Sequence, residues 1–379
     1  MRGAFCSKFV TLVCVISVAL VLVPGNANAD KDGYTVTLLA NPDEVPYIYA
    51  NDINDSGRIV GGMEFPVGGA YHQSAVMWKK WSSDPVVLEG LEGHDYVVAY
   101  AINNKGQVCG RSTDWTAELR AVVWDRHGNV KDMHPDLGGW WSEMWDINQY
   151  GDGTGFVYGP GRTRAFIYPA NGDDPYLLAL DTDVYVHSWP YEINKDMVVV
   201  GFARYDDGSG WGPTHACFWD EDGKFEDLHD DIEDDLGTDC VASKAWGVSD
   251  SGEIGGVAVV TQDTDTGIVT EAKAFVWTKE NGFDWVDSDG SDLSAIGGGG
   301  GKRFVGTIDG VLQYPQWYGA SVGVWTRGTV KGETVWNLDV LPMPDGYDSM
   351  IAWRANTAGR VVGVAADGDN VWSAFYATK

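Results

Sequence analysis

Short apolar segments recur along the whole chain and are separated by glycine and aspartate. Typical examples are AVMW at 75–78, AVVW at 121–124 and ACFW at 216–219. Runs of four to eight residues with this punctuation are typical of β-strands, and none of them shows a convincing helical stripe of apolar positions. The pattern predicts an all-β protein.

A longer phrase repeats around these segments. INDSGRIVGG begins at Ile53, INNKGQVCGR at Ile102 and INQYGDGTGF at Ile147. The second glycine of the phrase recurs at intervals of 45 to 57 residues, and its positions define units 1 to 7: Gly61, Gly110, Gly155, Gly201, Gly256, Gly306 and Gly363. Repeats of this length indicate a β-propeller or a solenoid.

Each unit accommodates four strands, except that the last unit stops one strand short. The segment YTVTLLA at 34–40 precedes unit 1 and has the character of the missing strand. We therefore expect a seven-bladed β-propeller of four-stranded antiparallel blades, closed by strand 34–40, with residues 30–379 forming one domain. A β-solenoid is the alternative.

The Asn-x-x-Gly part of the phrase predicts a tight turn between the first two strands of each unit. The asparagine side chain can cap the turn, and the glycine can adopt the left-handed conformation that closes it. Unit 4 has Met197 in place of this glycine. We therefore expect its turn to differ from the others.

The third strands carry a second motif. His215-Ala216-Cys217-Phe218-Trp219 in unit 4 and Lys273-Ala274-Phe275-Val276-Trp277 in unit 5 are its clearest copies. Together with the Ile-Asn-x-x-Gly-x-Val-x-Gly phrase, this resembles the HAF-type repeats of bacterial extracellular proteins, over residues 34–379. The resemblance implies export and a β-propeller-like fold, and it implies no particular activity.

The first 29 residues are typical of a secretory signal peptide. Arg2 and Lys8 precede an apolar run at 10–23, and Ala27-Asn28-Ala29 offers a small-residue cleavage site. We expect cleavage after Ala29 and a secreted or cell-surface protein without later membrane insertion. A membrane anchor is the alternative, although the run is shorter than the roughly 20 residues of a span.

The net charge limits the classes of partner, and the cysteine content limits the disulfides that can form. The formal net charge of −29 at pH 7 excludes nucleic acid and anionic membranes as favoured partners. Three cysteines follow the expected signal peptide: Cys109, Cys217 and Cys240. A Cys217–Cys240 disulfide is possible, but no disulfide framework is expected.

The long loops are expected to emerge on one face and to carry the function. Four inter-unit loops contain the histidines that are candidate metal ligands or catalytic acids and bases: His94, His134, His187 and His229. Loop tryptophans that could stack on sugar rings are Trp140, Trp141, Trp189, Trp211 and Trp317. The alternative is that these side chains are ordinary loop residues packed on the blades.

Acidic and basic residues add two further expectations. Asp181, Asp183, Asp230 and Asp231 could bind calcium, because hard cations prefer oxygen ligands; the alternative is a solvated acidic rim. Basic residues precede the third strand of four consecutive units, where ion pairs or hydrogen bonds between blades are expected: Arg120, Arg164, His215 and Lys273.

These features predict an exported binding or adhesion module, directed at extracellular glycans or a cell-surface protein and assisted by calcium if the acidic loops bind it. The alternative is an extracellular polysaccharide lyase or glycoside hydrolase with its site on the long-loop face. A purely structural surface protein is the third possibility.

Overall fold

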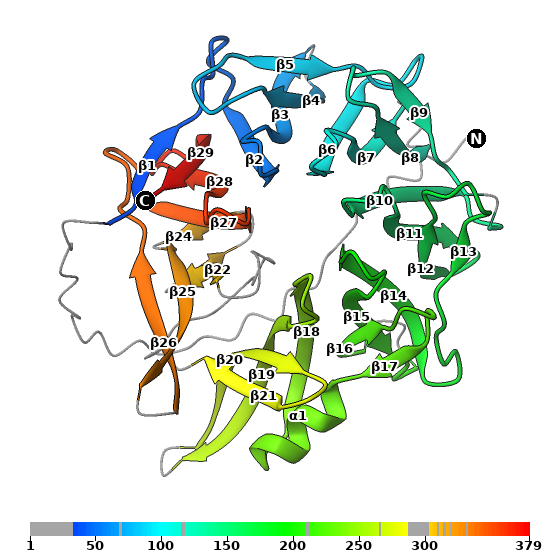
Figure 1. Cartoon of the computed structure of the whole chain (residues 1–379), viewed down its shortest axis with the longest axis vertical. Coiled ribbons are helices and arrows are strands. Elements are labelled where there is room, and N and C mark those ends of the chain that lie inside the picture. The colour runs from blue at the N-terminus through cyan, green and yellow to red at the C-terminus, as the bar shows by residue number, and fades with distance from the viewer. Residues whose placement is uncertain are drawn as a thin grey trace, which may run out of the picture.

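The computed structural model describes residues 33–67, 70–114, 118–135, 137–208, 212–264, 267–286, 303–308, 311–313, 316–318, 320–330 and 333–379. The expected signal peptide lies outside these ranges. Antiparallel sheets lie around a common centre (Figure 1). Within the described ranges, no helix has the length and apolar character needed to cross a membrane.

Units 1 to 4 each form four antiparallel strands in the predicted order. Unit 1 comprises β2 (Tyr47–Ile53), β3 (Ile59–Val67), β4 (Ala70–Trp78) and β5 (Pro85–Leu88). Unit 2 comprises β6 (Tyr96–Ile102), β7 (Val108–Thr113), β8 (Leu119–Trp124) and β9 (Val130–Asp132). Unit 3 comprises β10 (Trp141–Ile147), β11 (Gly153–Gly159), β12 (Arg162–Tyr168) and β13 (Tyr176–Leu177). Unit 4 comprises β14 (Tyr185–Ile193), β15 (Val199–Tyr205), β16 (Thr214–Trp219) and β17 (Phe225–Asp227).

The later units follow the same plan with additions. Unit 5 comprises β18 (Cys240–Val248), β19 (Ile254–Thr264), β20 (Gly267–Thr278) and β21 (Gly282–Val286), preceded by helix α1 (His229–Leu236). Unit 6 comprises β22 (Arg303–Ile308), β25 (Ser321–Val330) and β26 (Glu333–Val340), with a hairpin of β23 (Val311–Gln313) and β24 (Gln316–Tyr318). Unit 7 comprises β27 (Ser349–Ala355), β28 (Val361–Ala366) and β29 (Trp372–Thr378).

The first strand of the chain pairs with the last. β1 (Thr35–Leu38) runs antiparallel to β29, with Thr35 opposite Thr378 and Leu38 opposite Phe375. The pairing expected between the segment at 34–40 and the last unit is therefore present. It covers the outer edge of β29 that the seventh unit would otherwise expose.

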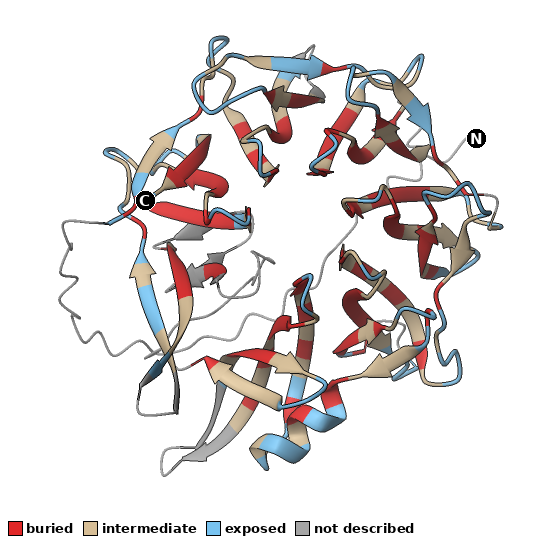
Figure 2. Ribbon diagram, in the orientation of Figure 1, coloured by how far each residue is buried: buried red, intermediate tan, exposed pale blue. Residues whose placement is uncertain are grey.

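In units 1, 2 and 4, a tryptophan at the end of the third strand anchors the unit to its neighbour. Trp78, Trp124 and Trp219 are fully buried, and their indole N–H groups donate to the carbonyls of Ala40, Glu89 and Ala179, at 3.1, 2.7 and 2.6 Å. Each acceptor belongs to the segment preceding the tryptophan's own unit. Burial is concentrated on the inner three strands of the units, whereas turns and outer strands are more exposed (Figure 2).

The recurring asparagine caps its own turn, as predicted, and also binds the next unit. In unit 2, Asn103 Oδ1 accepts the backbone N–H groups of Lys105 and Gln107, while Asn103 Nδ2 donates to the carbonyl of Asn148 at 3.0 Å. The same bridge joins Asn54 to Asn103, Asn148 to Asn194, and Asn356 to Asn54. The last of these bonds connects unit 7 to unit 1.

The second glycine of the phrase faces a β-bulge on the first strand. The inner strands of units 1 to 5 and 7 each contain one extra residue at this point: Asn51, Tyr100, Trp145, Tyr191, Trp246 and Trp353. A Cβ on Gly155 would lie 1.9 Å from the carbonyl oxygen of Glu143, and five equivalent glycines are equally close to a backbone oxygen, at 1.9 to 2.4 Å. The glycine is therefore required by close strand approach.

The structure corrects one expectation, excludes the possible disulfide and adds one helix. The turn of unit 4 does not differ: Met197 adopts φ 65° and makes the same backbone bond to Asn194 as the glycines do in their turns. Cys217 and Cys240 are separate buried thiols, so the disulfide between them is not formed: Cys217 packs with residues of units 3 and 4, and Cys240 with residues of units 4 and 5. The segment 229–236 forms a helix that the periodicity did not indicate.

Candidate functional site

An open hollow of about 460 Å³ lies between units 2 and 3. Its lining brings together three of the residues expected to bind a ligand, His134, Trp140 and Trp141, and adds three others, Glu118, Arg120 and Gly139. Arg120 lies on β8 and Glu118 directly precedes it, and the remaining residues lie on β10 or in the loop that leads to it. The hollow is thus built from one inter-unit loop and the two units that the loop connects.

The wall formed by unit 3 is aromatic. The side chain of Trp140 is 55% exposed and meets Tyr158 edge-on at 6.0 Å, whereas Trp141 stacks on Tyr158 at 5.2 Å. The Trp140 N–H donates to the Tyr158 carbonyl at 2.7 Å, which ties the loop to the end of β11. An exposed indole is therefore held on a fixed backbone.

The wall formed by unit 2 is charged. Arg120 forms an ion pair with Glu118, and its Nη1 lies 3.9 Å from Asp132 Oδ2. Two carboxylates thus surround one guanidinium, so this wall carries hydrogen-bonding groups without a net positive charge. Both partners of Arg120 belong to its own unit, so the expected pairing between blades is wrong for this residue.

The other members of the basic set also interact within their units. Arg164 donates to the Leu178 carbonyl at 3.0 Å, and His215 lies 3.1 Å from Asp227. Lys273 Nζ is 3.9 Å from Glu271. Pairing of the third and fourth strands brings the partners of Arg164 and His215 close, and Lys273 and Glu271 lie two residues apart on β20, so these contacts form inside a blade.

His134 is tied to the framework of the hollow. Its Nδ1 lies 2.7 Å from Ser142 Oγ, and that same oxygen accepts the N–H of Ala121 from unit 2. Burial, followed by the charge of Arg120, lowers the pKa of His134 below its usual value, although the charge of Asp132 and a backbone hydrogen bond with Gly139 oppose this shift. The lowered pKa favours the neutral imidazole, and its contact with Ser142 Oγ connects the loop to both units.

Two of the remaining candidate histidines make similar hydrogen bonds. His229 Nδ1 lies 2.7 Å from Ser243 Oγ, and His187 Nδ1 accepts the N–H of Thr163 at 2.9 Å. Burial lowers the pKa of both rings. His94 Nδ1 is buried without a hydrogen-bond partner among the residues described. Three of the four candidates thus hold inter-unit junctions together.

The other predicted ligands are dispersed. Trp189 stacks on Phe202 at 4.9 Å on the inner strands of unit 4. Trp211 and the side chain of Trp317 lie outside the described residues. Asp181 and Asp183 are exposed before β14, whereas Asp230 and Asp231 are exposed in the first turn of α1. In the described ranges, only Asp230 of these four shares a group of three potential metal ligands.

A polar cluster on the inner strands was missed by sequence reasoning. Glu143 accepts from Arg111 Nη1 and the Tyr100 hydroxyl, both at 2.9 Å, and from Trp145 Nε1 at 3.1 Å. Alternation along a strand could identify which residues share a face, but not that a bulge turns Tyr100 and Trp145 toward one carboxylate. These bonds satisfy the buried carboxylate and connect units 2 and 3.

Comparison with known proteins identifies the fold. No family model matches the sequence, and no curated protein matches it. The propeller domain of the Trilobed protease from Pyrococcus furiosus superimposes with a TM-score of 0.54 at 11% identity, covering 87% of this chain and 93% of that one. Oligogalacturonate lyase from Vibrio parahaemolyticus gives 0.52 at 11% identity, covering 91% and 96%. The chain is thus similar to β-propellers in fold.

Proposed function

We propose that this chain is an exported seven-bladed β-propeller that binds neutral saccharides in the hollow between units 2 and 3. The exposed, anchored indole of Trp140 beside a charged wall carries the proposal. The pairing of β1 with β29 and the bond from Asn356 to Asn54 support a closed ring of seven blades. The HAF-like motifs and the leader at 1–29 support the proposed family relationship and export.

The chemistry of the hollow suits a sugar. A pyranose presents C–H groups on its faces, which pack on an indole, and hydroxyl groups on its rim, which bond to carboxylate and guanidinium groups. Trp140 supplies the apolar surface, and Glu118 and Arg120 supply the acceptors and donors. Because two carboxylates offset Arg120 and the whole chain is strongly acidic, a neutral glycan is favoured over an acidic one.

Oligosaccharide binding by Trp140→Ala tests this proposal. The mature protein is screened on a glycan array, and the best neutral ligand is titrated by calorimetry with and without chelator. We expect Trp140→Ala to weaken binding at least tenfold. Trp81→Ala is the matched control, since Trp81 is also exposed, at 46%, but lies in the turn of unit 1. Equal affinity in both variants would place the binding elsewhere.

A separate assay addresses the enzyme alternative. His134 lines the hollow, but Ser142 and the backbone of Gly139 both engage its ring, which leaves it poorly suited to proton transfer. Incubation of wild-type protein with neutral and acidic polysaccharides should release no oligosaccharides. Release that disappears in His134→Gln would favour a lyase or hydrolase instead.

A further inference from the structure

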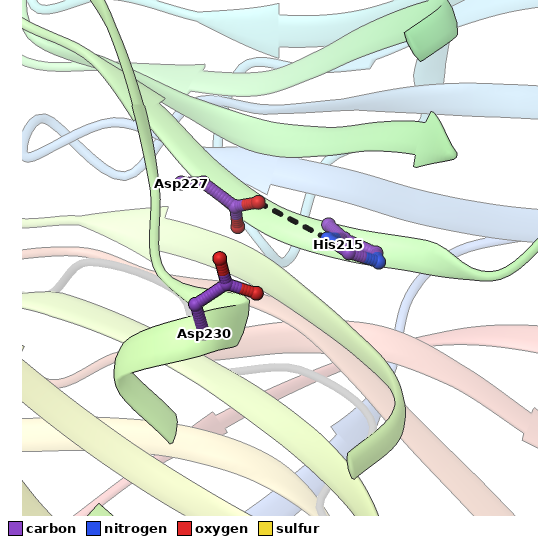
Figure 3. Close-up of side chains that lie close together, drawn as sticks. All are labelled: His215, Asp227 and Asp230. Carbon is purple, nitrogen blue, oxygen red and sulfur yellow. Dashed lines mark hydrogen bonds and ion pairs between the residues drawn. The ribbon is translucent and has the colours of Figure 1, made fainter. Parts of the chain in front are cut away.

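Unit 4 gathers one imidazole and two carboxylates at the loop that leads to unit 5. His215 lies on β16, Asp227 is the last residue of β17, and Asp230 lies in the first turn of α1 (Figure 3). One potential ligand atom from each residue lies within 4.8 Å of the others. In the described part of the chain, this is the group of three such ligands that could hold a metal ion.

Two of the three side chains are held in place by their surroundings. The His215 ring stacks on His229 at 3.8 Å and on Tyr205 at 5.6 Å, and the residue is only 8% exposed. Asp227 Oδ1 accepts the backbone N–H of His229 at 2.8 Å. The other oxygen of Asp227 accepts the Tyr185 hydroxyl and lies 3.1 Å from His215 Nδ1.

Unit 2 provides an internal comparison. Asp132 occupies the position of Asp227, and its Oδ1 accepts the N–H of His134 at 2.8 Å, just as Asp227 accepts that of His229. At the position of His215, unit 2 has Arg120, a permanent cation without a lone pair. The same local framework therefore carries a group that repels metal ions in unit 2 and a potential nitrogen ligand in unit 4.

We propose that His215, Asp227 and Asp230 bind a divalent transition-metal ion of the zinc class. Zinc and cobalt accept one imidazole nitrogen together with carboxylate oxygens, at roughly 2.0–2.2 Å, whereas calcium takes oxygen ligands alone. The 3.1 Å between His215 Nδ1 and Asp227 Oδ2 fits neighbouring ligands of such an ion. Asp230 is exposed and can rotate to complete the site.

This arrangement leaves coordination open on the solvent side. Three protein ligands occupy fewer positions than a four- to six-coordinate ion offers, so water or an external ligand completes the shell. Tyr185 and the backbone of His229 remain as outer partners that orient Asp227. The site is independent of the saccharide hollow, because it lies in unit 4 and uses none of the hollow's residues.

Cobalt titration of tag-free protein, residues 30–379, tests the site after dialysis against chelator. We expect one equivalent of Co²⁺ with visible d–d absorption, displaced by Zn²⁺ and retained in millimolar Ca²⁺. His215→Arg, which reproduces unit 2, and Asp230→Asn, an exposed change that does not threaten folding, should each weaken binding at least tenfold. Asp132→Asn, the matched control in unit 2, should bind Co²⁺ as the wild type does.

Three results would overturn the proposal. They are absence of Co²⁺ uptake by folded wild-type protein, unchanged affinity in Asp230→Asn and His215→Arg, and an intense thiolate charge-transfer band, which would place the ion on a cysteine. Circular dichroism of each variant establishes that it is folded. Saccharide binding is measured on His215→Arg and Asp230→Asn and should not change, so a failure here is distinct from a failure at the hollow.

Discussion

Replacing Asn103 separates the two roles of the recurring asparagine. This side chain is 4% exposed; its Oδ1 caps the turn at Lys105 and Gln107, and its Nδ2 reaches the Asn148 carbonyl of unit 3. In unit 5, a serine takes the place of this asparagine. There Ser249 Oγ accepts the N–H groups of Ser251 and Glu253 but has no amide to donate.

Asn103→Ser should therefore keep the turn and lose the two bonds that Nδ2 donates, the bridge to Asn148 and a bond to Gln107 Oε1 at 2.9 Å. A buried carbonyl that loses its partner costs about 1–3 kcal/mol, so we expect about 2 kcal/mol of lost stability. Asn103→Ala also leaves the Gln107 N–H without its hydrogen-bond partner, and we expect a total loss of stability of about 3–4 kcal/mol. Urea unfolding followed by tryptophan fluorescence measures both values, with unchanged m-values showing that the unfolded state is comparable.

The comparison between the two variants decides the interpretation. If Asn103→Ser is as stable as the wild type, the inter-unit bond contributes nothing and the asparagine serves its own turn alone. If serine and alanine are equally damaging, the hydroxyl does not replace Oδ1, and the parallel with Ser249 is wrong. The first result would refute the idea that amide bridges between successive units stabilise the fold.

Two further predictions concern close packing and pH. Gly155→Ala should lower the free energy of unfolding by more than about 3 kcal/mol, because its Cβ would overlap the Glu143 carbonyl. Gly368→Ala is the control: its Cβ would meet only a side chain at 3.7 Å, so its stability should equal that of the wild type within about 0.5 kcal/mol. Urea unfolding measures both values. Burial lowers the pKa of Lys244 from 10.5 to about 8, so the unfolded state binds more protons between these values. Wild-type stability relative to Lys244→Met should therefore rise from pH 8 to 10.5; a constant difference would contradict this.

Much of the fold could be predicted because its signals are local. A tight turn requires Asn and Gly at defined offsets, and a strand that closely approaches its neighbour requires glycine, so residues such as Asn103 and Gly155 repeat with each unit. Met197 shows where this reasoning fails. Its φ of 65° is unfavourable by itself but is imposed by the surrounding turn, and local preference alone predicts a different conformation.

The candidate site was only partly predictable. His134, Trp140 and Trp141 were expected on the loop face, and the structure does bring them together around one hollow. Nothing in their spacing indicated that Arg120 would be matched by carboxylates of its own unit. Likewise, His215 entered the basic set as an ion-pairing residue, and only the pairing of β16 with β17 places it beside Asp227.

By itself, the sequence determined the repeating strand plan, the turn chemistry and the strongly acidic surface, because each depends on residue type and short-range spacing. Tertiary structure decided which loops meet, which histidines form hydrogen bonds between units, and where an aspartate faces an imidazole. Those outcomes depend on strand register and bulges between segments that lie far apart in the chain. A one-residue change in register would redirect the same side chains to other partners.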